Sequence, residues 1–287
     1  MPAGAVGLFG PESVSWRLLR ENAISVLGGA RALILQVAHP LVGAGVSEHS
    51  NYREEPWGRL FRTLEATSTI IFGTAGEAEA AARQVWRIHG HVRGELPQDA
   101  GRYPAGTPYD ARDPELLMWV HATLVDTALL VYDRYVAPLS LSDRAAYYEE
   151  QKLFAEMFGV PRELLPETYL DFTRYFDDVV ERELAVTAAL KDVIDATLLN
   201  PLLPPPARPL RRPLAEAVKW QTAATLPSRL RDELGLGWGP ARLRLSEISE
   251  SLVRTVLPLV PGALREYPKA RAADRRLEGS ESPPPSD

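Results

Sequence analysis

The spacing of apolar residues constrains this chain most: they recur every three or four positions along most of its length and rarely alternate one by one. A period near 3.6 is that of an amphipathic helix, whereas a half-buried strand has a period of two. Proline and glycine interrupt the pattern at intervals that suit helices of ordinary length. The chain is therefore predicted to be all-α, a multi-helix bundle.

Ten helical segments follow from this pattern. Asp113 before Pro114 places a capping side chain ahead of a proline at the first helical position, and Ser142 with Asp143 opens another helix. The predicted ranges are 13–27, 30–38, 57–72, 77–93, 114–135, 142–158, 166–176, 179–198, 213–223 and 239–257.

A proline-rich stretch near 200–213 predicts an extended linker, because six prolines there prevent a helix. About 75 residues follow it, which would make a thin core on their own. We therefore expect residues 1–276 to form a single domain with a C-terminal helical extension. Residues 277–287 are rich in serine, proline and acidic groups, so a disordered tail is expected there.

Composition excludes several classes of function. The net charge of -6 gives no electrostatic footprint for nucleic acid. The absence of cysteine excludes iron–sulfur clusters, thiolate-ligated haem, zinc ribbons and cysteine nucleophiles. The N-terminus lacks a secretory signal and no apolar stretch reaches the roughly 20 residues of a membrane span. A cytoplasmic protein without a transmembrane segment is expected.

The five histidines, at 39, 49, 89, 91 and 121, all lie in the first half of the chain. In segment 77–93 the predicted buried stripe consists of Ala78, Ala81, Val85, Ile88 and Val92. His89 lies on the edge of this stripe, whereas His91 is about 200° further around the helix. His89 is thus the better internal ligand. For either residue the alternative is a core histidine paired with a backbone carbonyl.

His121 is also predicted to face an apolar environment, because it shares a helix face with Leu124 and Ala128. Nearby Thr123 and Asp126 could form either a helix–helix hydrogen-bond network or part of a site. His39 precedes Pro40 and is expected at a helix end, where the dipole favours a cationic imidazole; a role in the pocket is the alternative.

Common catalytic motifs are absent from the sequence. There is no Glu-x-x-His of a di-iron bundle, no His-Glu-x-x-His, no Gly-x-Ser-x-Gly and no phosphate-binding loop. What remains is a helical bundle with inward histidines and no thiols. A haem held by a proximal histidine is physically natural in that setting.

Several motifs resemble the MpaB-type oxygenases and latex-clearing rubber oxygenases of bacteria and fungi. The first is residues 31–40, Arg-Ala-Leu-Ile-Leu-Gln-Val-Ala-His-Pro, followed by Gly45-Val46 and His49-Ser50. Further matches in order are Arg59-Leu60 to Thr63, Phe72-Gly73, Val85 to His89, Val92-Arg93-Gly94, Asp113-Pro114, Leu116-Leu117 and Trp119 to Thr123. The resemblance covers residues 9–135 well and the rest loosely.

This resemblance implies a globin-like helical core that holds haem b and performs dioxygen chemistry on carbon–carbon double bonds. It implies His89 as the iron ligand, with His91 as competitor, and Arg59 and Thr63 as catalytic residues one helical turn apart. Arg62 stands where the rubber oxygenases have a lysine that can reach iron, and a guanidinium cannot ligate. The family's catalytic glutamate would be Glu48, Glu54 or Glu55.

The sequence therefore predicts a haem b-dependent oxygenase acting with dioxygen or peroxide on a small apolar, isoprenoid-like or unsaturated molecule. The predicted cofactor-binding residues are His89, Arg59, Thr63, Arg93 and His121, with Arg87 an alternative to Arg93 for a haem propionate. The alternative is a non-catalytic haem- or ligand-binding helical protein. The oligomeric state is left open.

Overall fold

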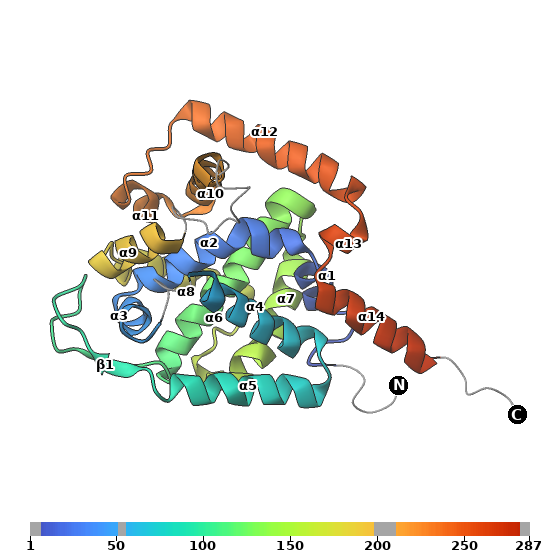
Figure 1. Cartoon of the computed structure of the whole chain (residues 1–287), viewed down its shortest axis with the longest axis horizontal. Coiled ribbons are helices and arrows are strands. Elements are labelled where there is room, and N and C mark those ends of the chain that lie inside the picture. Colours follow the sequence, from blue (N-terminus) through green and yellow to red (C-terminus); the bar gives the residue numbers. More distant parts are fainter. Residues whose placement is uncertain (1–6, 51–55, 198–210, 282–287) are drawn as a thin grey trace, which may run out of the picture.

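The computed structural model describes residues 7–50, 56–197 and 211–281, apart from the side chains of 56–61, 197, 211, 280 and 281. This part of the chain contains fourteen α-helices, and its only sheet is a two-stranded hairpin. The predicted all-α fold is confirmed (Figure 1).

Two helices form the centre of the bundle and pack along each other: α2 (Asn22–Ala38) and α6 (Pro114–Val131). Most of α6 is buried, and it continues into a π-helical turn, η1 (Tyr132–Val136). Together α6 and η1 are long and apolar enough to span a bilayer, but 72% of the apolar window is buried inside the bundle. That is the position of a core helix. Around this centre lie α7 (Leu141–Met157), α8 (Tyr169–Arg182), α9 (Ala188–Thr197) and α10 (Arg211–Thr225).

The chain turns sharply at His39, where α2 ends and α3 (Pro40–His49) begins at an angle of 104°. Pro40 occupies the first helical position, where a missing N–H costs nothing because that group has no intrahelical partner.

A second apolar cluster lies at the other end of the bundle. It joins α1 (Val14–Leu19), α4 (Pro56–Phe72), α5 (Ala75–His89) and α14 (Pro268–Glu281). Trp16 packs edge-on against Phe72 with ring centroids 5.0 Å apart. Helix α5 opens with a capping box between Thr74 and Glu77, and the hairpin of β1 (Arg93–Glu95) and β2 (Pro108–Asp110) follows it.

The C-terminal helices lie around the outside of the bundle (Figure 1). Its remaining helices are α11 (Ser228–Glu233), α12 (Pro240–Val256) and α13 (Gly262–Arg265). Short 3-10 turns, η2 (Arg162–Leu164) and η4 (Leu257–Leu259), complete the order. Helix α14 then returns to α1, where Asp274 pairs with Arg20 at 2.7 Å.

Several predicted boundaries differ from the structure. Segment 13–27 is broken between α1 and α2, and 77–93 ends as a helix at His89, so Arg93 lies in β1. Side chains satisfy the carbonyls at this helix end: Arg112 donates to the Trp86 carbonyl at 2.8 Å, and Arg93 donates to the Gly90 carbonyl at 2.7 Å.

The disordered tail predicted from Leu277 was wrong for its first residues, because α14 continues to Glu281. Leu277 is only 6% exposed and joins Ala270 and Ala273 in the second apolar cluster. Tertiary burial of this helix face outweighs the polar composition around it. Residues 282–287 and most of the proline-rich stretch near 200–213 lie outside the described residues, whereas Pro213 lies within α10.

Candidate functional site

A half-open apolar pocket of about 110 Å³, here called the cavity, lies between α2, α4, α6 and α7. Leu64, Ile71, Leu124, Ala128 and Phe154 form much of its wall. Its shape and lining suit a small apolar molecule, because such pockets rely on hydrophobic walls with few polar groups.

The close approach of α2 and α6 shapes one side of this cavity. A Cβ atom at Gly28 would lie 2.6 Å from Cγ2 of Thr127, so only glycine allows the two helices to pack at this distance. Polar atoms in the wall are bonded within the protein: Thr127 Oγ1 accepts from Arg31 at 2.6 Å, and Gln151 Nε2 donates to Ser15 Oγ at 2.9 Å. The cavity therefore presents mostly apolar surface to a guest.

His121 lies on α6, one turn before Leu124, and is 5% exposed. Its ring stacks on Phe154, which lines the cavity, with centroids 5.8 Å apart. Neither ring nitrogen has a hydrogen-bond partner among the residues that the structure describes. Burial lowers the pKa of His121 to about 4, so the imidazole is neutral at pH 7. A neutral imidazole of this kind can accept or donate one hydrogen bond to a guest.

The other predicted ligand, His89, is half-buried at the last residue of α5 and does not line the cavity. His91 is exposed in the turn that follows. Of the predicted stripe of α5, Ala78 is buried and Ala81 and Val85 are half-buried. The prediction was wrong at Ile88, which is 50% exposed, because the end of this helix reaches the surface. The structure thus places His89 deeper than His91 without placing it beside the cavity.

Of the predicted residues on α4, Thr63 and Arg62 are exposed, and the side chain of Arg59 lies outside the described residues. Thr63 is one turn from the cavity: its carbonyl accepts the hydroxyl of Thr67, a wall residue, at 2.9 Å. Arg93 is also exposed, in the hairpin that follows α5. Neither Thr63 nor Arg93 lines the cavity in this structure.

A buried polar network beside the cavity was not predicted as a whole. The guanidinium of Arg31, 2% exposed, pairs with Asp126 at 2.6 Å and donates to the carbonyl of Thr225 at 2.8 Å. Gln36 donates to Thr123 at 3.1 Å. Thr123 and Asp126 therefore belong to a helix–helix network, the structural alternative considered for them. The polar Arg31 and Gln36 within the otherwise apolar run 31–38 were the sequence signal.

His39 occupies a second polar cluster. Tyr103 lies 3.4 Å from His39 Nε2 and donates to Glu183 at 2.5 Å, and Arg102 pairs with the same carboxylate at 2.7 Å. Burial, and then the charge of Arg102, lower the pKa of His39 to about 4. The prediction of a cationic His39 was wrong because the bend buries this helix end.

A third cluster lies where α3 meets the hairpin. Tyr109 donates to Glu48, and its hydroxyl lies 3.3 Å from His49 Nε2. Burial, and then the hydrogen bond to Glu48, raise the pKa of Tyr109. The two other glutamate candidates, Glu54 and Glu55, lie outside the described residues.

Among the described residues no three His, Cys, Asp or Glu side chains converge as a metal site. A haem iron needs only one protein nitrogen, so this finding bears on protein-ligated metal ions and not on haem.

Comparison with known proteins identifies the fold's family. Residues 16–257 match the family described as ER-bound oxygenase mpaB/B'/rubber oxygenase, catalytic domain. The chain belongs to this family. The match runs from α1 to the end of α12 and contains every wall residue of the cavity except Tyr267. The resemblance seen in the sequence is confirmed, and with it an oxygenase-like domain.

Two similar proteins do not narrow the range of activities that this chain could have. The uncharacterized proteins Mb2261 of Mycobacterium bovis and Rv2237 of Mycobacterium tuberculosis are each 25% identical over 236 residues. The alignment covers 81% of this chain and 88% of each relative. No solved structure matches the chain.

Proposed function

We propose that this protein is a haem b-dependent oxygenase that oxidises a small apolar, isoprenoid-like or unsaturated molecule with dioxygen or peroxide. One observation carries the proposal: an apolar cavity in the part of the chain that matches an oxygenase family adjoins the buried imidazole of His121, which has no hydrogen-bond partner among the described residues. Buried polar groups are normally paired, so the lone His121 favours a guest that is part of the working protein.

The residues fit a haem in chemistry more readily than in volume. The described part of the chain offers a half-buried histidine, His89, apolar walls and the neutral His121. The cavity of about 110 Å³ is smaller than the ~300–1,000 Å³ of a typical cofactor pocket. Binding a macrocycle therefore requires the cavity walls to move apart.

When bound, haem would supply the iron that activates dioxygen or peroxide. His89 and Arg93 lie outside the cavity wall in this structure; in the proposal His89 would hold the iron through a ring nitrogen, and Arg93 would pair with a propionate. Arg59 and Thr63 are the proposed catalytic residues of α4. His121 would present a neutral imidazole beside the bound molecules, able to form one hydrogen bond with an oxygen atom of the oxidant or product. The walls around Phe154 would exclude water.

The proposal is tested by titrating the full chain with hemin and following the Soret band. His89→Ala should abolish or greatly weaken haem retention, whereas His91→Ala, an exposed imidazole two residues away, should retain it. Loss of the band in His91→Ala alone would reverse the assignment, and no saturable binding to the wild-type chain would refute the proposal.

A second candidate is a non-catalytic haem- or ligand-binding protein. The bonded polar atoms of the wall favour it, because they leave few groups free for chemistry. Turnover of an alkene by the haem-loaded chain separates the two functions: an oxygenase yields oxidised product, whereas a carrier yields none.

A further inference from the structure

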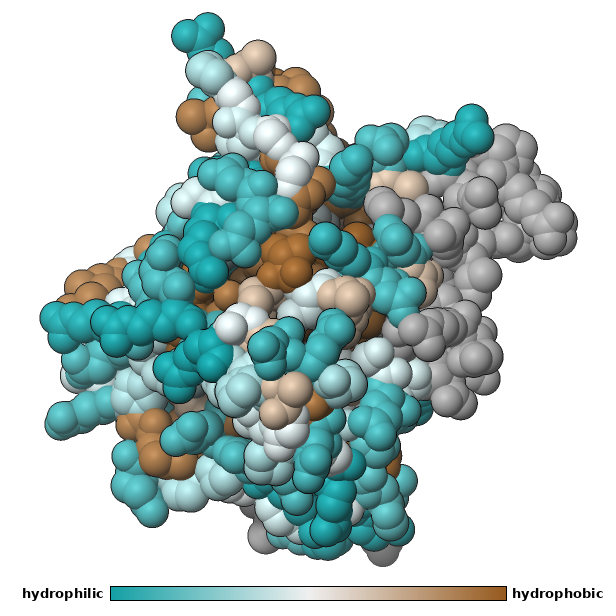
Figure 2. Space-filling view, turned by 90° about the vertical axis from the view of Figure 1, so that its left-hand side faces the viewer, coloured by the Kyte–Doolittle hydropathy of each residue, from teal (hydrophilic) through white to brown (hydrophobic). Residues whose placement is uncertain are grey.

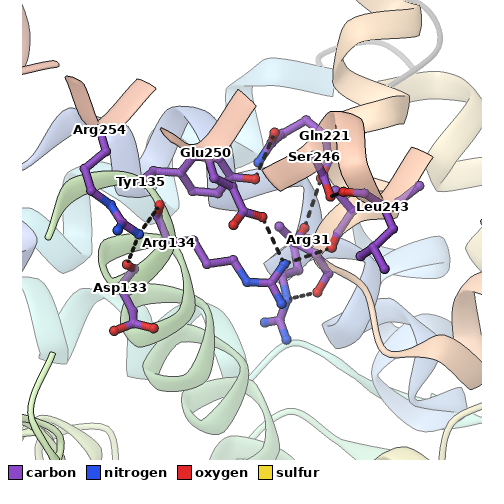
Figure 3. Close-up of polar contacts among 12 residues, drawn as sticks. Arg31, Asp133, Arg134, Tyr135, Gln221, Leu243, Ser246, Glu250 and Arg254 are labelled. Atoms are coloured by element: carbon purple, nitrogen blue, oxygen red, sulfur yellow. Dashed lines mark hydrogen bonds and ion pairs between the residues drawn. The ribbon is translucent and has the colours of Figure 1, made fainter. Parts of the chain in front are cut away.

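Helix α12 is amphipathic, but its polar face packs against the rest of the protein and its apolar face is exposed to solvent. Arg254 donates to the carbonyls of Asp133 at 2.9 Å and Arg134 at 2.8 Å, and Glu250 pairs with Arg134 at 3.5 Å (Figure 3). Ser246 is buried on the same side. These contacts with η1 fix how the helix is rotated, so its outer face cannot turn inward without breaking them.

The outer face carries five large apolar side chains in a row, here called the α12 stripe. Its members, with their exposed fractions, are Leu245 (54%), Ile248 (64%), Leu252 (61%), Val256 (45%) and Leu259 (80%) in the turn after the helix. Three of them are leucines spaced by seven residues, the repeat of a helix–helix seam. Figure 2 shows exposed hydrophobic residues at the top of the molecule, where α12 lies in Figure 1.

We propose that the α12 stripe binds the same stripe of a second copy, forming an antiparallel two-fold dimer. The stripe is its own complement in this orientation. With Leu252 on the two-fold axis, Ile248 of one copy faces Val256 of the other, and Leu245 faces Leu259. An interface of this kind closes on itself and therefore gives a dimer rather than a filament.

Area and charge support a second copy as the occupant. The exposed fractions correspond to roughly 500 Å² of apolar surface per copy, well over half of the ~800 Å² that one partner gives to a standard interface. Arg242 and Arg244 are exposed at the N-terminal end of the stripe. Antiparallel packing brings them to the carbonyl end of the other α12, which favours cations, whereas parallel packing would bring four arginines together.

The dimer is independent of the proposed oxygenase function, because the contacts that carry it lie on α12 and η1. Its test is the mass of the full chain by sedimentation or light scattering across a dilution series. The wild-type chain should be a dimer and Leu252→Glu a monomer, because two carboxylates would meet on the axis. Leu170→Glu, a matched change at another exposed leucine (53%), should stay dimeric.

Cysteine cross-linking tests the register, since the native chain has no cysteine. Under mild oxidation Leu252→Cys should form a disulfide-linked dimer, Leu245→Cys should not, and the double variant Leu245→Cys/Leu259→Cys should. Cross-linking of every single variant would indicate parallel helices and overturn the proposal. A wild-type chain that is monomeric at all concentrations would also overturn the dimer proposal. If that monomer floated with phosphatidylcholine vesicles, the α12 stripe would be a membrane-binding surface instead. Circular dichroism of each variant confirms that the helices are intact.

Discussion

The two buried histidines should make the ligand-free protein sensitive to mild acid. His121 and His39 each have a folded-state pKa of about 4, against an ordinary value of 6.5, mainly because burial disfavours the charged ring. A histidine with a lowered folded-state pKa does not reduce the free energy of unfolding above pH 6.5. As the pH falls toward 4 that free energy decreases, because the unfolded chain takes up the proton first. By linkage each residue should cost about 2 kcal/mol of unfolding free energy by pH ~5, and about 3 kcal/mol by pH ~4.

The variant that tests this is His121→Leu, which fills the same space against Phe154 without ring nitrogens. Urea unfolding followed by helical circular dichroism, at pH values of about 7.5 and 5, gives the two free energies. The wild-type chain should lose about 4 kcal/mol between them and His121→Leu about 2 kcal/mol, the share of His39. At the higher pH the variant should be more stable by about 1–3 kcal/mol, since it removes buried unpaired polar atoms.

The matched control is His91→Leu, because His91 is exposed and its ring contacts water in both states. This variant should lose the same free energy with acid as the wild-type chain. If His121→Leu and the wild-type chain lost equal free energy between the two pH values, the assignment of His121 as a neutral, buried and unpaired residue would be refuted.

Two further predictions concern α4 and the polar network. In the haem-loaded chain, Arg59→Ala should lower oxidation activity or perturb the haem spectrum far more than Arg62→Ala. The second variant is the control, because it removes the same charge three residues later. If both variants kept near-wild-type turnover and spectra, Arg59 and Thr63 would not belong to the site. Arg31→Met should destabilise the chain by about 3 kcal/mol in urea unfolding, because Asp126 loses its 2.6 Å partner. Adding Asp126→Leu should recover part of that loss, and a purely additive double variant would show that the pair does not interact.

The helices that could be predicted from the sequence are those whose burial follows the local apolar period. Segments 57–72, 114–135 and 142–158 correspond to α4, α6 with η1, and α7. The period could not predict α14, whose sequence is polar and whose Leu277 is buried only because α1 and α4 lie beneath it. It also missed the end of α5, which depends on Arg112 reaching Trp86 from beyond the hairpin.

Part of the candidate site, the inward direction of His121, could also be predicted from the sequence, whereas the cavity could not. The face shared by His121, Leu124 and Ala128 indicated that His121 points inward, and the structure buries it. The cavity itself depends on Gly28 meeting Thr127 across two helices, a pairing that no local pattern contains. For the same reason the Arg31–Asp126 pair could not be predicted from the sequence, in which the two residues are 95 positions apart.

The most direct test of the proposed function is the absorption spectrum of the full chain as purified, before and after reduction with dithionite. The proposal predicts a Soret band at about one haem per chain, shifted on reduction, and removed by His89→Ala. A chain that is purified without this band and cannot be reconstituted with hemin would contradict the proposal that this member of the mpaB/rubber oxygenase family uses haem.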